Sequence, residues 1–301
     1  MGRAIKPSGG GRQQQPSIAV ALKKQQKEAL RTGNMPHDNG LLPDTLIMPT
    51  GRHLPGWYAD FRTRLKLERT RAWARATDYW ATLVFAYWLV RPRPALDRRR
   101  VPTIARDLHR EASTRLAEGN LAPIEARLCE GFLMSLRTRI AQRAPDRALK
   151  WTLHKYLGPP KTVSYKATMM PIQPGEQATQ RNGCLQAVVR IRSLQSLRQV
   201  RKVSTKDAGG KVVGSREVFV DAAGRVTGVV GEEGDAVPGG AKETTEHLVV
   251  QKSIRVGKAS PWMVWGTTEE TSMDALRAEW KRAAKVKQAA KAAKAGRSAV
   301  A

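Results

Sequence analysis

The stretch Cys184 to Val200 reads CLQAVVRIRSLQSLRQV, and its alternation of residue types decides the fold class. One side of an extended chain would carry Leu185, Ala187, Val189 and Ile191. The other side would carry Gln186, Val188, Arg190 and Arg192. A period of two residues with a β-branched centre is typical of a half-buried strand. We therefore predict the long central strand of a curved antiparallel sheet.

Positive charge dominates this strand and the whole chain. Residues 181–202 hold six Lys/Arg and no acid, so we expect the polar side of the strand to face water or a polyanion. The side chains predicted to contact RNA phosphates here are Arg190, Arg192, Arg198, Arg201 and Lys202. Across 301 residues, 53 Lys+Arg oppose 26 Asp+Glu, a formal net charge of +27. Such a surplus suits RNA or an anionic membrane surface, and the length predicts one principal domain with extensions.

Several protein classes are disfavoured by the composition. The two cysteines, Cys129 and Cys184, follow no pairing or metal-binding spacing, which indicates a reduced compartment. No apolar run reaches the roughly 18 residues of a membrane-spanning helix. No Asn-x-Ser/Thr glycosylation site occurs. We therefore expect a protein that is not secreted.

Residues 1–56 are predicted to form a basic, largely irregular arm. Up to Arg31 the arm carries seven Lys/Arg and a single acid, Glu28, and residues 18–31 could form one short basic helix. A basic, nearly acid-free beginning is typical of an organelle transit peptide. The alternative is a retained arm that becomes ordered only on a partner. Both interpretations stay open.

Residues 57–100 are predicted to form a basic and aromatic helical unit, with one long helix over 57–90. Residues 61–75 are rich in Lys/Arg, and residues 79–90, YWATLVFAYWLV, are apolar on all sides. Twelve helical residues rise about 18 Å, short of the roughly 30 Å hydrocarbon layer. This segment therefore packs into protein or lies in a membrane interface, where Trp and Tyr are enriched. The predicted membrane-proximal residues are Arg62, Arg64, Arg69, Trp80, Tyr87, Trp88 and Arg91.

Two amphipathic helices are predicted next. The first spans residues 101–118, with Thr103 as its N-cap and Gly119 after its end. The second begins at Pro123 and carries an apolar residue at every fourth position as far as Ile140. A short loop joins them, which predicts an αα-hairpin.

After Trp151 the apolar period changes to two. The predicted strands are 162–170, 185–197, 216–220, 225–230, 246–256 and 262–268, with a turn at 221–224 and a flexible acidic loop at 231–240. Helices followed by antiparallel strands predict an α+β fold.

Ser272 would cap a basic C-terminal helix within 273–301, whose apolar stripe is Met273, Leu276 and Trp280. This helix would form on phosphates or remain a solvated tail; its predicted RNA-binding residues are Lys281, Arg282, Lys285, Lys287, Lys291 and Lys294.

Catalytic and metal-binding motifs are not evident. No phosphate-binding glycine loop occurs, and the five histidines have no close metal-ligand spacing. We expect His109, between Leu108 and Arg110, to be a helix-surface group and not a base. No Asp/His pair stands out on the strands. The sequence therefore favours a binding protein without a cofactor over an enzyme.

Three stretches carry a family resemblance when they are taken together. They are RALKWTLHKYLGPPKTV (147–163), LQAVVRIRSLQS (185–196) and EHLVVQKSIRVGKASPWMVWGTTEE (246–270). Their marks are a Trp-x-Leu before the first strand, the long arginine-bearing strand and a W-x-x-W-G that ends the sheet. In this order they resemble the C-terminal domain of the import-motor tether of the mitochondrial inner-membrane translocase. A mitochondrial large-ribosomal-subunit protein and the inner-membrane ribosome receptor of fungi share that domain.

The resemblance covers residues 101–272 and implies a cone-like α+β fold similar to nuclear transport factor two. It implies a docking module of the mitochondrial matrix, peripheral on the inner membrane, and not an enzyme. The basic N-terminal arm favours the ribosomal branch, whose partners would be large-subunit rRNA, ribosomal proteins near the tunnel exit, inner-membrane lipid, the membrane insertase and nascent chains. The alternative is a membrane-bound tether of the import motor that binds chaperone and lipid but no RNA. Residues 204–245 look like an insertion relative to this family.

Overall fold

The computed structural model describes residues 40–42, 45, 47–50, 54–56, 60–143, 148–170, 182–206, 212–220, 225–229, 241–255, 258–278, 280–282, 284–285 and 288. Helices come first: α2 (Phe61–Val84), the π-helical turn η2 (Phe85–Leu89), α3 (Val101–Glu118), the 3-10 helix η3 (Ala122–Arg127) and α4 (Glu130–Ala141). The strands follow: β1 (Ala148–Tyr156), β2 (Lys161–Met170), β3 (Asn182–Lys206), β4 (Val212–Val220), β5 (Val226–Val229), β6 (Lys242–Arg255), β7 (Lys258–Ala259) and β8 (Met263–Thr268). The predicted α+β order is confirmed.

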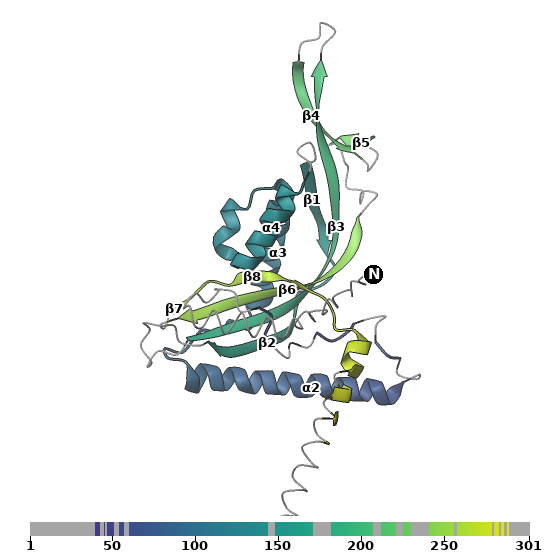
Figure 1. The fold of residues 1–301 in the computed structure, drawn as a ribbon. Coiled ribbons are helices and arrows are strands. Elements are labelled where there is room, and N and C mark those ends of the chain that lie inside the picture. The colour runs from purple at the N-terminus through teal and green to yellow at the C-terminus, as the bar shows by residue number, and fades with distance from the viewer. Residues whose placement is uncertain are drawn as a thin grey trace, which may run out of the picture.

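Strand β3 organises one antiparallel sheet that curls into a half-barrel. Its first part pairs with β2 on one edge and β6 on the other, and its last part pairs with β1 and β4 (Figure 1). Strands β5, β7 and β8 extend this sheet through β4 and β6. The predicted long central strand is confirmed, and at 25 residues it is longer than the predicted range.

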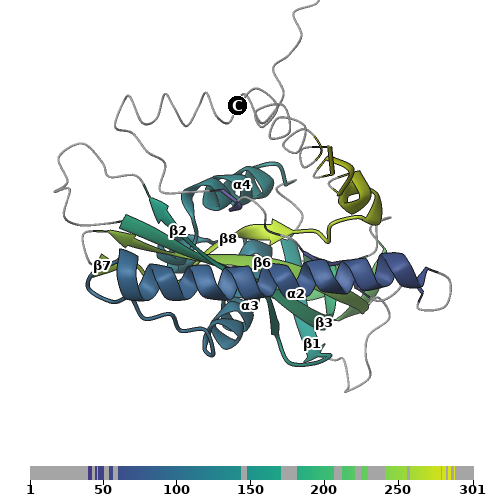
Figure 2. The same ribbon diagram turned by 90° about the horizontal axis from the view of Figure 1, so that it is seen from below.

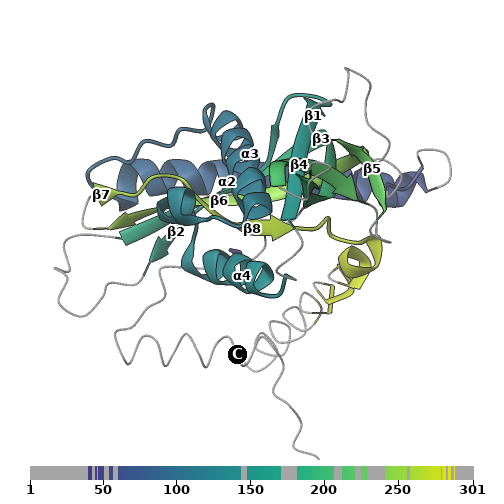
Figure 3. The same cartoon turned by 90° about the horizontal axis from the view of Figure 1, so that it is seen from above.

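The sheet has helices on both faces. Helices α3 and α4 lie over one face, whereas α2 crosses the other (Figures 1, 2 and 3). The main hydrophobic core fills the α3 side, and the odd-numbered apolar residues of β3 lie in it as predicted: Leu185, Ala187, Val189 and Ile191.

The opposite side of β3 is not open to water over its first half, so that part of the prediction is wrong. Gln186 is buried: its Nε2 donates to the Gly40 carbonyl at 2.8 Å, and its Oε1 accepts from the Leu42 amide at 2.9 Å. Val188 packs with Ile47 and Val249. Described residues of the segment predicted as an irregular arm therefore form a second layer on the sheet.

Helix α2 joins these two layers. It begins after Asp60, whose carboxylate accepts a hydrogen bond from the Thr63 amide. At its end the Val90 amide donates to the Phe85 carbonyl, five residues back, which widens the helix into the turn η2. Phe85 thereby enters the main core and lies against Gly183 of β3.

The predicted helical hairpin forms with two corrections. Helix α3 begins at Val101 with Pro102 in its first turn, so Thr103 is inside the helix and is not its cap. Gly119 ends it in the left-handed conformation (φ 77°), as predicted. The second helix is broken, because Leu128 forms a bridge with Val264 and the Cys129 amide donates to the Val264 carbonyl at 2.9 Å.

Strand β1 and the short β7 were not predicted. Trp151 and Leu153 lie inside β1, so the Trp-x-Leu mark does not precede the first strand. The turn at 221–224 and the loop at 231–240 lie outside the described residues. Ser272 caps the last helix as predicted, since its hydroxyl accepts from the Ala275 amide at 3.2 Å, and Leu276 is buried against α2.

Candidate functional site

Helix α2 and the adjoining turn η2 present aromatic side chains to solvent. Trp73, Trp80 and Trp88 have exposed fractions of 77%, 62% and 64%, and Tyr79 and Tyr87 are also exposed. Trp73 and Trp80 are two helical turns apart and therefore lie on the same face. Large exposed aromatic side chains at this density are unusual for a surface that meets only water.

Basic side chains share this face. Arg62, Lys66 and Arg69 are exposed, and Lys66 Nζ lies 4.3 Å from the centre of the Trp280 ring. Arg91, after the aromatic turn, is exposed as well. We define Arg62, Lys66, Arg69, Trp73, Trp80, Tyr87 and Trp88 as the α2 outer face.

Arg64, one of the predicted membrane-proximal residues, does not lie on this face. Only 13% of its side chain is exposed, and its Nη2 lies 3.0 Å from the Glu68 carboxylate. Its position therefore serves the packing of α2 on the protein.

The apolar segment 79–90 divides between two environments. Thr82, Phe85, Ala86 and Val90 are buried, whereas the aromatic side chains at 79, 80, 87 and 88 face outward. The sequence left packing and membrane interface as alternatives for the whole segment; the structure buries one side of it in protein and leaves the other side exposed. Among the described residues no helix is long and apolar enough to cross a membrane.

The arginines of β3 do not form one continuous free surface. Arg192 pairs with Glu243 at 2.6 Å, and the Arg198 guanidinium lies 4.7 Å from the centre of the Phe219 ring. Arg201 is exposed, and Arg190 lines a cavity under α2. The Lys202 side chain lies outside the described residues.

The predicted basic residues of the C-terminal segment are only partly described. Lys281, Arg282 and Lys285 are exposed. Lys287, Lys291 and Lys294 lie outside the described residues. The three described side chains are therefore accessible to solvent.

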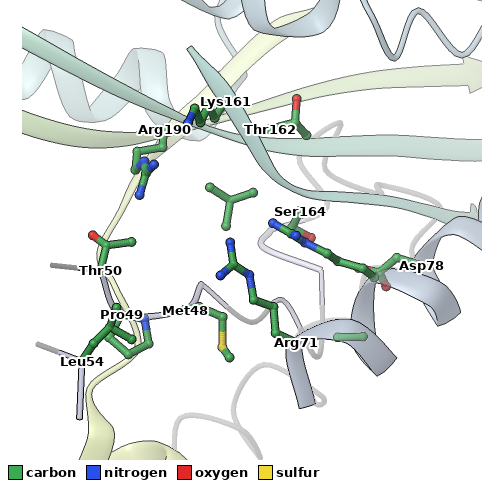
Figure 4. Close-up of a pocket in the computed structure, with 13 residues that line it drawn as sticks. Met48, Pro49, Thr50, Leu54, Arg71, Asp78, Lys161, Thr162, Ser164 and Arg190 are labelled. Carbon is green, nitrogen blue, oxygen red and sulfur yellow. The ribbon is translucent and has the colours of Figure 1, made fainter. Parts of the chain in front are cut away.

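The cavity under α2 has a volume of about 560 Å³ and lies between α2, strands β2 and β3, residues 48–50 and Leu54 (Figure 4). Its cationic lining residues are Arg71, Arg75, Lys161 and Arg190. Burial, followed by the neighbouring Arg71 charge, lowers the pKa of Arg75. The sequence could not reveal this cluster, because it joins a helix to two strands that are about 90 and 120 residues further along the chain.

His109 is buried, which overturns its predicted place on the helix surface. Its Nε2 lies 2.5 Å from the Glu246 carboxylate, and the ring meets Trp151 edge-on with 5.8 Å between centres. Its Nδ1 is buried without a hydrogen-bonding partner among the described residues. Since a general base must reach the proton that it abstracts, this buried nitrogen is poorly placed for catalysis. The pair ties α3 to β6.

A second ion pair ties the segment after α2 to the sheet. Lys252 is buried on β6, and its Nζ lies 2.8 Å from the Asp97 carboxylate. The hydrogen bond from Lys252 lowers the pKa of Asp97, against the opposing effect of partial burial. Tyr165 donates a hydrogen bond to the Leu96 carbonyl, and burial raises its pKa.

Among the described residues, no group of three His, Cys, Asp or Glu side chains could hold a metal ion. Comparison with models of known protein families and with curated protein sequences finds no match for this chain. The features of the chain that bear on function are therefore the α2 outer face, the basic surfaces and the resemblance in the three quoted stretches.

Proposed function

We propose that this protein docks the exit region of the mitochondrial large ribosomal subunit to the inner membrane, as a peripheral protein of the matrix. The half-barrel with α3 and α4 across one face fits the cone-like fold implied by the resemblance. The proposal includes no catalytic role, and it takes the part-buried pair of His109 and Glu246 as a link between α3 and β6.

The observation that carries the proposal is the α2 outer face. Its tryptophans are exposed while the opposite side of the same helix is anchored by buried Leu67 and Phe85. A firmly packed helix thus holds aromatic rings and cations in one plane, as interfacial helices do. Arg62, Lys66 and Arg69 would each gain about 1 kcal/mol near an anionic leaflet, or about 3 kcal/mol together.

Liposome flotation of the full chain tests the membrane contact. The double variant Trp80→Ser/Trp88→Ser should no longer float with vesicles that contain anionic lipid, and its melting temperature should stay that of the wild type. Met134→Ser is the matched control, because Met134 is exposed on α4, far from the α2 outer face in sequence and on the other side of the sheet. Unchanged flotation of the double variant would remove the α2 outer face from the proposal.

The RNA contact is proposed for the exposed Arg201 of β3 and for the basic residues of the C-terminal segment. Phosphate contacts release counterions, so affinity falls with salt at a slope set by the number of phosphates neutralised. Deletion of residues 281–301 should weaken binding to large subunits and lower that slope. The same affinity and slope in the truncated chain would make the segment a solvated tail.

The alternative function is a membrane-bound tether of the import motor that binds lipid but no RNA. The α2 outer face suits this function equally well, and only the partner differs. Sedimentation after mild detergent lysis separates the two. A protein that migrates with import complexes and never with large subunits would favour the tether.

A further inference from the structure

The cavity under α2 concentrates positive charge at one point. Arg71 and Arg75 enter it from α2, Lys161 from β2 and Arg190 from β3. Figure 4 shows Arg71 and Arg190 pointing into the same space from opposite sides. Three separate elements thus converge on one volume with the same sign of charge.

This charge is only partly balanced by the surrounding protein, through the ion pair between Arg71 and Glu68 at 3.6 Å. Asp78 is the one carboxylate among the described lining residues, and it lies 3.4 Å from Lys166 Nζ outside the cavity. Lys161 and Arg190 are direct neighbours across the β2 and β3 ladder, an arrangement in which like charges destabilise a sheet. For the other three cationic lining residues, Arg75, Lys161 and Arg190, no side-chain hydrogen bond or ion pair is found among the described residues.

The wall also carries small hydroxyl groups. Thr162 and Ser164 line the same cavity (Figure 4); Thr50 lines it as well, but its hydroxyl already donates to the Glu270 carboxylate. Thr162 Oγ1 is buried and has no hydrogen-bonding partner among the described residues. Guanidinium groups and hydroxyls together are the donors that bind phosphate oxygens in proteins.

The neighbouring surface limits what the anion can be. The adjoining groove shares Thr50 and Arg190 with the cavity, but it continues past Glu243, Glu269 and Glu270. A long polyanion such as RNA would be repelled along that course. The charge distribution therefore favours a compact anion over an extended one.

We propose that this cavity binds a single phosphate group, held by Arg71, Lys161 and Arg190. The site is independent of membrane docking, because its residues lie on the side of α2 that faces the sheet. The group can belong to a soluble phosphate or to a lipid headgroup, which have the same chemistry at the cavity.

Calorimetric titration of the full chain with inorganic phosphate tests the site, beside a melting curve in phosphate and in sodium chloride of equal ionic strength. The variant Lys161→Gln/Arg190→Gln should lose at least tenfold in phosphate affinity. Without phosphate it should melt no lower than the wild type, because the repulsion across β2 and β3 is removed. The control Arg110→Gln/Arg139→Gln removes two exposed charges from α3 and α4 and should bind phosphate as the wild type does.

Two further arms identify the source of the phosphate. Vesicles of phosphatidylcholine with phosphatidic acid that displace inorganic phosphate would assign a lipid headgroup; failure to displace it would assign a soluble phosphate. The proposal is overturned if the wild type binds no inorganic phosphate, or if the Lys161 and Arg190 variant binds it equally well. It is also overturned if these substitutions weaken only the binding of an RNA oligonucleotide.

Discussion

The turn η2 places two aromatic residues three positions apart in opposite environments, and their substitution should have very different costs. Phe85 is 2% exposed and packs in the main core, whereas Trp88 is 64% exposed. Truncating a buried Phe to Ala removes its transfer free energy and leaves a cavity, for about 3–5 kcal/mol. A surface substitution is usually within about 0.5 kcal/mol of neutral. Phe85→Ala should therefore be several-fold more costly than Trp88→Ala.

Urea unfolding followed by far-ultraviolet circular dichroism measures both changes. For a folded unit of this size, the Phe85 loss corresponds to a fall of roughly 6–20 °C in melting temperature. Trp73→Ala, on the same helix and 77% exposed, is a second surface control. A loss of more than about 2 kcal/mol at Trp88, or of less than about 1 kcal/mol at Phe85, would refute the assigned orientation of the segment.

Three more predictions concern the same scaffold. In Gly183→Ala the new Cβ would lie 2.3 Å from the buried Phe85 ring, so we expect a loss of about 1–3 kcal/mol in urea unfolding, relieved by Phe85→Leu; additive losses would contradict this contact. Gln186→Leu removes the hydrogen bonds that hold Gly40 and Leu42 to the sheet. Limited proteolysis should therefore cut the chain near residues 40–42 faster than in the wild type. The lowered pKa of Asp97 contributes stability above about pH 4 that is lost as the pH falls through that pKa. The destabilisation by Asp97→Asn should therefore shrink on acidification, and a constant difference would argue against the ion pair with Lys252.

The strands and helices could be predicted where buried apolar residues recur at a regular spacing along the chain. The apolar alternation at 185–191 and the four-residue apolar spacing at 104–116 each correctly predicted which side of the strand or helix packs in the core. Strand β1 was missed because its side chains are only half-buried at best, which leaves a weak apolar alternation. The break before α4 was missed because Leu128 and Cys129 are held by Val264, more than 130 residues further on.

The site could be predicted only in part, for a similar reason. The basic and aromatic residues of α2 could be identified in the sequence, but their exposure was left open. The inward orientation of Arg64 and the burial of Phe85 depend on the neighbouring layers. Gln186 is buried by residues about 145 positions earlier in the chain. The polar side of the strand was therefore predicted to face water, although its first half is covered by protein. Burial of His109 likewise follows from its partner on β6.

Flotation of purified mitochondrial large subunits with anionic liposomes tests the central claim most directly. Subunits that carry the wild-type protein should float with the vesicles. Subunits that carry Trp80→Ser/Trp88→Ser should retain the protein but remain at the bottom of the gradient. If the wild-type protein does not migrate with large subunits, or if subunits without it float equally well, the proposed docking role is contradicted.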